Sequence, residues 1–266
     1  MKRRLPSLLL ILIVTVLFAC SARVRITTAY APKAVVINTS SYYDDNGRFT
    51  VVGEVQNTGD VALKQVTVLT ALYDSKGKSI ANGSVNLLEP YLILAVLEIG
   101  EKLPFRYRTF MPKEWGPYSY AVGGPTYLIG EGKPLKLKIV DDTRYTDQAG
   151  YLHVTGYVEN LAEKDAFAVG VTATFYGPDG KVVAASHSTL SESVPRSGGK
   201  RFFDLRIEDM DRSRIASIQT YRLYAQSYEY NMIPEFPSPL LVSGFALTTI
   251  SLIVRASHRS KRKERE

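Results

Sequence analysis

The sequence predicts an all-β protein that consists of two tandem antiparallel β-sandwiches, together with an N-terminal signal segment and a C-terminal transmembrane helix. Two observations support this fold class. Residues 49–81 align with residues 152–184 without a gap, and ten of the 33 aligned pairs are identical. Between the ends of the chain, short runs rich in β-branched residues alternate with turn signals, and no long stretch has helical periodicity. A block of about a hundred residues that occurs twice indicates two copies of one small domain.

The predicted strands follow the same order in both copies. Each copy has a strand that alternates as half-buried strands do, a turn cluster, a longer β-branched strand, a glycine-containing hairpin turn and a returning strand. These strands cover residues 49–56, 64–73 and 78–81 in the first copy and residues 151–159, 168–176 and 181–186 in the second. Later strands are expected at Phe105 and Phe203, and final strands at residues 118–122 and 220–226.

The repeat also sets the expected domain boundaries. We expect a first sandwich over residues 33–122, a glycine-rich linker over residues 123–133 and a second sandwich over residues 134–230. The linker is short enough to limit relative motion of the two domains. Asp44–Gly47 and the pair Asp141 and Asp142 are each expected to form a turn before the first strand of a copy.

The charge distribution argues against a nucleic-acid partner. The formal net charge is +7, but the excess comes from Lys2, Arg3 and Arg4 and from the tail over residues 255–266, while the stretch between them is neutral. Cations that flank apolar segments are typical of membrane topology signals rather than of a phosphate-binding face. The single cysteine, Cys20, excludes an intrachain disulfide and a cysteine zinc site, so core packing and sheet hydrogen bonds must hold the body.

Residues 1–22 have the layout of a secretory signal peptide. Basic residues 2–4 precede an apolar run from Leu8 to Ala19, which is short for a membrane-spanning helix. The segment from Leu17 to Cys20 resembles the lipobox of lipoproteins, in which the cysteine becomes the lipidated first residue. Two outcomes stay open: lipidation at Cys20, or ordinary signal cleavage nearby, for instance after Ala22.

A second membrane segment is expected at the C-terminus. Residues 231–254 are interpreted as a proline-containing stalk and an apolar run from Pro237 to Val254, which as a helix would extend about 27 Å and approach the thickness of a bilayer core. The basic tail, residues 255–266, would stay cytoplasmic by the positive-inside rule. This gives a single-pass protein of the cell membrane with the bulk of its chain extracellular. The alternative is a buried globular helix followed by a solvated tail.

A set of matched positions carries a family resemblance. In the first copy these are Gly53, Val55, Asn57, Leu72, Tyr73, Asp74, Gly77, Lys78, Gly100 and Phe105, and in the second Gly156, Val158, Asn160, Phe175, Tyr176, Gly180, Lys181, Gly198 and Phe203. With this pattern both copies resemble the FxLYD domain, an immunoglobulin-like β-sandwich of prokaryotic envelope proteins. The resemblance implies two immunoglobulin-like binding or spacer modules without established catalytic residues.

Pro234, Glu235, Phe236 and Pro237 lie directly before the apolar run. Together with the expected helix and the basic tail, this motif resembles the PEF-type C-terminal sorting signals of archaeal surface proteins. The resemblance implies processing by an archaeosortase-type enzyme. The alternative is an unprocessed, proline-stiffened stalk next to the membrane.

The sequence offers no catalytic grouping, metal site or cofactor-binding motif. His153 and His187 have no partner at metal-ligand spacing, and there is no GxSxG motif. Asn38 and Asn82 begin N-glycosylation sequons. A tyrosine cluster is interpreted either as an aromatic platform or as strand-face side chains; it consists of Tyr221, Tyr224, Tyr228 and Tyr230. An apolar run is interpreted either as a patch for a protein partner or as a core strand; it consists of Tyr91, Leu92, Ile93 and Leu94.

These observations predict a non-enzymatic, membrane-anchored extracellular protein that displays two β-sandwich binding or spacer domains in adhesion or in the cell envelope. No cofactor is expected. The expected partners are the membrane and a protein at the cell surface. The alternative is a lipoprotein-like accessory or substrate-binding subunit of a membrane transporter or surface enzyme.

Overall fold

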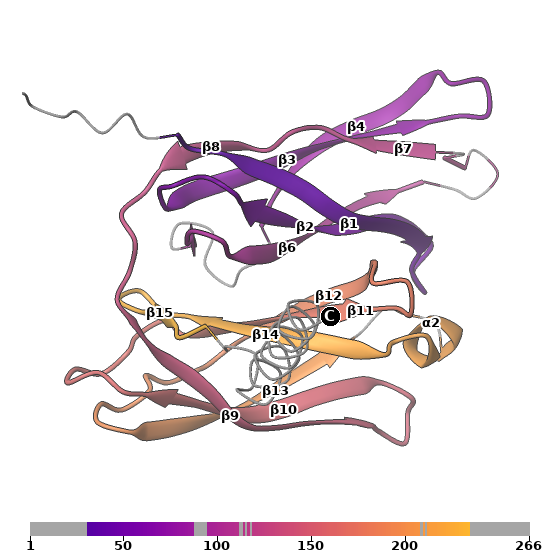
Figure 1. The fold of residues 1–266 in the computed structure, drawn as a ribbon. Coiled ribbons are helices and arrows are strands. Elements are labelled where there is room, and N and C mark those ends of the chain that lie inside the picture. Colours follow the sequence, from indigo (N-terminus) through magenta and orange to yellow (C-terminus); the bar gives the residue numbers. More distant parts are fainter. Residues whose placement is uncertain are drawn as a thin grey trace, which may run out of the picture. The chain divides into compact units, whose positions relative to one another are not determined.

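The computed structural model describes residues 31–87, 95–111, 114, 116–117, 119–207, 210 and 212–234. These residues form an all-β protein with three sheets and one short helix, α2 (Arg212–Ala216) (Figure 1). The predicted all-β class with antiparallel sheets is therefore confirmed. The expected signal peptide and transmembrane helix lie outside the described residues, and within those residues no helix is long and apolar enough to cross a bilayer.

The first eight strands, which we call the N-terminal strand set, form two sheets. β1 (Ala34–Tyr43), β2 (Arg48–Asn57) and β6 (Lys102–Phe110) pair in the order β1-β2-β6. The second sheet consists of β4 (Ser79–Asn86), β3 (Leu63–Tyr73) and β5 (Val96–Leu97), with β7 (Ser119–Val122) and β8 (Thr126–Ile129) also paired to β3. Fully buried side chains of both sheets, including Val51, Leu72 and Phe105, belong to one core, as in a β-sandwich.

The remaining strands, the C-terminal strand set, form one seven-stranded sheet in the order β12-β11-β14-β15-β9-β10-β13. Its strands are β9 (Leu135–Thr146), β10 (Leu152–Asn160), β11 (Gly170–Tyr176), β12 (Val182–Thr189), β13 (Gly199–Ile207), β14 (Thr220–Gln226) and β15 (Asn231–Met232). The arms β12-β11-β14 and β9-β10-β13 correspond to the two sheets of the N-terminal set. β15 joins these arms because it pairs antiparallel with β14 and parallel with β9.

The internal repeat extends to irregular backbone positions. Asn38 and Asp141, which are 103 residues apart, have φ angles of 56° and 53°, and each lies where the register shifts in the first strand of its set. Gly53 faces the first of these bulges and pairs with Phe105. A Cβ atom on Gly53 would lie 2.8 Å from both the Phe105 ring and the Thr39 methyl group. Close packing against the bulge therefore requires glycine at this position.

Two details differ from the expectations. Asp141 and Asp142 do not form a turn; they lie within β9, because aspartate tolerates the left-handed backbone conformation that the bulge needs. The turn before β10 is Asp147–Gly150, with a φ of 92° at Gly150. In addition, β8 lies inside the range expected to be a linker and pairs with β3, which leaves residues 130–134 between β8 and β9.

Asn57 and Asn160 hold equivalent loops, and both are fully buried. The side-chain amide of Asn57 donates to the carbonyls of Val61 (2.8 Å) and Leu97 (2.9 Å), and its oxygen accepts from the backbone N–H of Gly59 (3.0 Å). Asn160 makes the same three kinds of bond, with Lys164, Val194 and Ala162. Each amide therefore satisfies buried backbone groups in the loop that follows its strand.

Replacing Asn160 by alanine is expected to destabilise the protein by about 1–3 kcal/mol, because the carbonyl of Lys164 would lose this donor and the carbonyl of Val194 would keep only the N–H of Ala166. Urea unfolding followed by circular dichroism measures this loss. The matched control is Gln148→Ala at an exposed turn position. Equal stability of the two variants would contradict the role assigned to Asn160.

Candidate functional site

The two strand sets meet where β1, β2 and β6 contact β11 and β12 (Figure 1). Along β2, the alternate residues Phe49, Val51 and Val55 belong to the hydrophobic core. Thr50, Val52 and Glu54 point to the opposite face and are nevertheless fully buried. β2 is therefore covered on both faces. The sequence predicts a half-buried strand, and the C-terminal strand set covers the face that was expected to be exposed.

The carboxylate of Glu54 is a buried charge within this junction, with 0% exposure. Its Oε1 accepts a hydrogen bond from the hydroxyl of Tyr176 (2.5 Å) and lies 3.9 Å from Nη1 of Arg222, both in the C-terminal set. Its Oε2 accepts from the side-chain amide of Asn38 (3.3 Å). Burial, followed by the Glu54 charge, raises the pKa of Tyr176, so this hydroxyl remains a donor at neutral pH. Because a buried carboxylate is costly without partners, association of the two sets requires the donors that surround Glu54.

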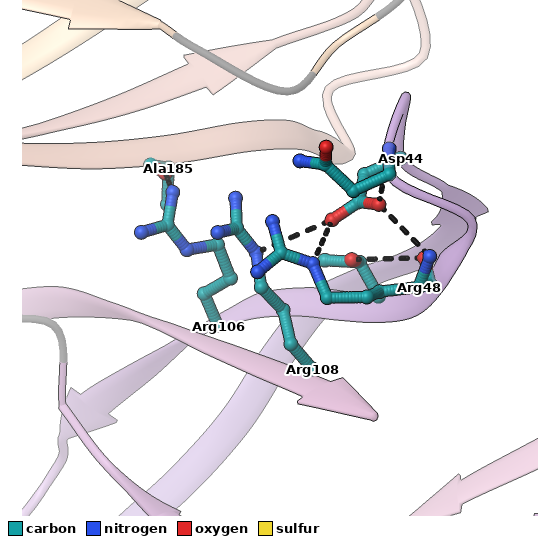
Figure 2. A network of polar contacts seen from close by, with 7 residues as sticks. Asp44, Arg48, Arg106, Arg108 and Ala185 are labelled. Atoms are coloured by element: carbon teal, nitrogen blue, oxygen red, sulfur yellow. Dashed lines mark hydrogen bonds and ion pairs between the residues drawn. The ribbon is translucent and has the colours of Figure 1, made fainter. Parts of the chain in front are cut away.

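A second polar network surrounds Asp44 in the hairpin turn between β1 and β2 (Figure 2). Oδ2 of Asp44 lies 2.8 Å from Nε of Arg48 and 3.8 Å from Nε of Arg108, and its Oδ1 accepts from the backbone N–H of Arg48. Arg106, on the same strand as Arg108, donates from Nη1 to the carbonyl of Ala185 in β12 (2.8 Å). The Asp44 carboxylate thus stabilises its own turn and orders arginines beside the junction.

Arg214 of α2 adds a further contact from the C-terminal set. Its guanidinium carbon lies 4.0 Å from the ring centroid of Tyr42 in β1, within the range of a cation–π interaction. Its Nη2 donates to the hydroxyl of Ser40 (2.9 Å), and its Nε donates to the carbonyl of Val183 (2.9 Å). The short helix therefore holds β1 against β12.

A cleft of about 690 Å³ lies beside the junction. Its polar lining comes from both strand sets: Glu98, Glu101, Lys102, Lys133, Arg222 and Tyr224. Oε1 of Glu98 accepts from the backbone N–H of Lys133 (2.7 Å) and from the side chain of Asn231 (2.6 Å). Nη2 of Arg222 donates to the carbonyl of Lys102 (2.9 Å). A mixed lining of this kind suits a polar ligand that carries charges of both signs.

The carboxyl group of Glu101 is part of the lining of this cleft. Burial raises the pKa of its carboxyl to about 7, although the hydrogen bond from the Tyr224 hydroxyl (2.5 Å) opposes the shift. Burial, followed by the Glu101 charge, also raises the pKa of Tyr224, so the tyrosine keeps its proton. The bond between the two strand sets at this point therefore involves a carboxyl group that changes charge near neutral pH.

The predicted site residues are dispersed over the structure. Asn38 is exposed, but its amide is bonded to Glu54, whereas Asn82 is exposed on β4 at the edge of its sheet. Pro234 is exposed at the rim of the cleft. Cys20, the run from Tyr91 to Leu94, and Glu235, Phe236 and Pro237 lie outside the described residues.

The four tyrosines of the predicted cluster have different surroundings. Tyr224 is buried in the cleft wall, and the hydroxyl of Tyr221 donates to Asp142 (2.6 Å). Tyr228 is 63% exposed in the loop between β14 and β15, and Tyr230 is half-buried. A common binding platform for all four side chains is therefore not formed.

Sequence reasoning missed the partners of His153. Its Nδ1 lies 2.8 Å from Oδ1 of Asp204, its Nε2 lies 3.4 Å from Oδ2 of Asp147, and its ring stacks on Tyr145. The backbone N–H of Tyr151 is the main group that lowers the pKa of Asp147. Within the part of the chain that the structure describes, no group of three histidine, cysteine or acidic side chains could hold a metal ion.

A comparison of the two copies could have indicated the junction. Glu54 aligns with Tyr157, which is 40% exposed, and Arg106 aligns with Asp204 through the Phe105–Phe203 match. At both positions the first copy carries a charge that the second lacks or reverses. Such differences within a repeat indicate surfaces where the copies have different neighbours.

Comparison with known proteins identifies no family. The sequence matches no family model and no curated protein. A solved structure to which the chain is similar is that of red sea bream transglutaminase, with 11% sequence identity and a TM-score of 0.23. The match covers 80% of this chain and 32% of the transglutaminase chain, so this protein spans about a third of that enzyme's length.

Protein stability is expected to fall as the pH rises from about 4.5 to about 7 through Glu101. Its folded-state pKa of about 7 exceeds the value of 4.5 for an unperturbed carboxyl, so the folded state binds more protons in this window. The loss amounts to at most about 3 kcal/mol and stays constant above pH 7. Glu101→Gln, which keeps an acceptor for Tyr224, should remove this contribution in thermal unfolding over the same pH range.

Glu163→Gln, at an exposed loop position, is the control for this titration. An unchanged pH profile in the Glu101→Gln protein, relative to the control, would show that Glu101 does not titrate in this window.

Tyr176→Phe is expected to destabilise the protein by about 1.5–3 kcal/mol, because the buried Glu54 carboxylate loses a hydroxyl donor. The control Tyr157→Phe, at an exposed tyrosine of the same strand set, should have little effect. The two melting temperatures give the comparison, and equal values would exclude a role for the Tyr176–Glu54 bond in holding the strand sets together.

Proposed function

We propose that the protein is a non-enzymatic, membrane-anchored extracellular protein of the cell envelope. Two immunoglobulin-like β-sandwiches of the FxLYD type are displayed as a single binding or spacer unit, with a role in adhesion or envelope architecture. The observation that carries the proposal is the junction. Glu54, Glu98 and Glu101 of the N-terminal set each accept hydrogen bonds from the C-terminal set, which favours one extended unit over two independent modules.

The charge distribution supports the anchored arrangement. The body between the terminal segments is neutral, and the excess positive charge flanks apolar runs at the two ends of the chain. The body would be extracellular, and residues 255–266 would be cytoplasmic until an archaeosortase-type enzyme cleaves near Pro234–Pro237. Without that enzyme the apolar run would remain as a single-pass anchor.

Protease treatment of intact cells tests the location. With a tag after Glu266 and an antibody against the body, external protease should remove the body while any tagged fragment stays protected. Protection of the body on intact cells, together with its cleavage after lysis, would contradict an extracellular location. The tag also tests processing, because mature surface protein that keeps it at full length has not been cleaved.

The cleft favours a second candidate function, that of an accessory or substrate-binding subunit of a membrane transporter or surface enzyme. Its charged lining comes from both strand sets and could hold a polar group of a partner or substrate. Affinity purification from gently solubilised membranes tests this role. A transporter or enzyme that is recovered with wild type and with the Lys76→Ala control, but not with Lys102→Ala, would support it. Recovery of the chain alone favours the display function.

A further inference from the structure

The first described strand, β1, and the last, β15, both begin at the same end of the fold, which we call the exit end, and β15 then runs from this end in the direction of β9. Among the described residues the exit end includes the loops over residues 58–62, 98–101, 130–134, 161–169, 190–198 and 227–230. Lys33, before the first strand, accepts hydrogen bonds at its carbonyl from Thr58 and Gly59. Asn231, near the last described residue, donates from its backbone to the carbonyl of Pro134. In Figure 1 this end lies at the left, where β8 leads to β9 and where β15 lies.

The exit end carries exposed apolar side chains from separate loops and strand ends. Phe167 is 55% exposed and Tyr228 is 63% exposed, and the two are neighbours because the backbone N–H of Tyr228 donates to the carbonyl of Phe167. Other large exposed apolar residues at this end are Ile99, Ile129, Leu135 and Leu161. An exposed group of this kind in a soluble fold is typical of an interaction surface.

The opposite end has a different composition. It presents four tight turns rich in aspartate and glycine: Asp44–Gly47, Asp74–Gly77, Asp147–Gly150 and Gly177–Gly180. Exposed aromatic rings occur there too, but Tyr145 stacks on His153 and Tyr151 lies beneath Arg206. Phe110, at the end of β6, is also exposed, and it precedes a segment in which residues 112, 113, 115 and 118 are not described. The polar turns suit contact with water, so the two ends of the fold are suited to different surroundings.

The chain length beyond the body indicates what the exit end contacts. The apolar run begins at Pro237, three residues after Pro234, and three residues extend at most about 10 Å. A bilayer entered by that run would therefore lie close to β15. Because β15 runs away from the exit end, the chain must turn back after Pro234 for the bilayer to meet the neighbouring loops. Phenylalanine, tyrosine and leucine side chains at this depth are stabilised at the boundary between headgroups and acyl chains.

We propose that the exit end lies in the interfacial layer of the lipid bilayer, with Phe167 and Tyr228 as its contact residues. This inference rests on the proposed membrane anchor and adds a second point of attachment, which would fix the orientation of the body relative to the membrane. The charges near this surface are mixed, with Lys136 and Lys164 beside Glu131 and Glu163, all exposed. Apolar contact rather than attraction to anionic lipid would therefore hold it, so its membrane contact should change little with salt.

The test is the depth of single spin labels in the full-length chain, reconstituted into phosphatidylcholine–phosphatidylglycerol vesicles. Labels are attached to Phe167→Cys or Tyr228→Cys in a Cys20→Ser background, with Lys76→Cys at the polar end as the matched control. A fourth label at Leu247→Cys reports on the proposed anchor. Each label is scored by its collision rates with oxygen, which concentrates in the bilayer, and with a water-soluble nickel chelate.

We expect the labels at positions 167 and 228 to collide with the chelate several-fold less often than the label at position 76, and more often with oxygen. This difference should persist at high salt. Chelate-accessible labels at 167 and 228, with an oxygen-rich label at 247, would overturn the lipid contact and leave the anchor in place. A water-exposed label at 247 would instead overturn the anchor.

A second copy of the chain is the competing occupant of this surface. Shielding of positions 167 and 228 that persists in detergent and increases with protein concentration would show self-association and would contradict the lipid contact. Loss of shielding on transfer from vesicles to dilute detergent supports it.

Discussion

The buried carboxylate of Glu54 is the constraint on which the arrangement of the two strand sets depends. A charge with 0% exposure must be compensated, and its donors at 2.5 Å and 3.3 Å come from Tyr176 and Asn38, on different strand sets. If the sets separated, water could solvate the carboxylate, but the apolar and polar surface around β2 would be exposed at the same time. The junction is therefore specified by a polar contact within a larger buried area. The second copy has Tyr157 at the position of Glu54, so it has no buried carboxylate there that needs donors.

Much of the fold could be predicted from the sequence, because the features that define the strands are local. The strands β2, β3, β10 and β11 lie within a few residues of their expected positions, and Gly77 and Gly180 form the expected turns with φ angles of 77° and 73°. The bulges at Asn38 and Asp141 and the strand β8 were not predicted. These features depend on pairing with residues far away in the chain, such as Gly53 or Leu63, and a local pattern carries no information about such pairing.

The candidate site was harder to predict for the same reason. Glu98 and Glu101 are far in the chain from Arg222 and Tyr224, and nothing in the local sequence distinguishes these residues from surface residues. Their chemistry arises only when the second strand set covers the turn before β6 and raises the pKa of Glu101. Conversely, the segments with the most specific local signals, the lipobox-like sequence and most of the Pro-Glu-Phe motif, lie outside the described residues.

The parallel pairing of β15 with β9 has a mechanical consequence. Ile233 donates to the carbonyl of Leu137, and the chain leaves the body along the direction of β9. Tension applied through residue 234 along that axis would load the bonds between β15 and β9 together, in shear, instead of opening them one after another. Resistance to pulling is governed by the rate of unfolding rather than by equilibrium stability. A surface protein pulled along this axis could therefore withstand brief forces, such as those from flow or from contact between cells, whereas a pull that turns the chain back toward the exit end would break the same bonds one after another.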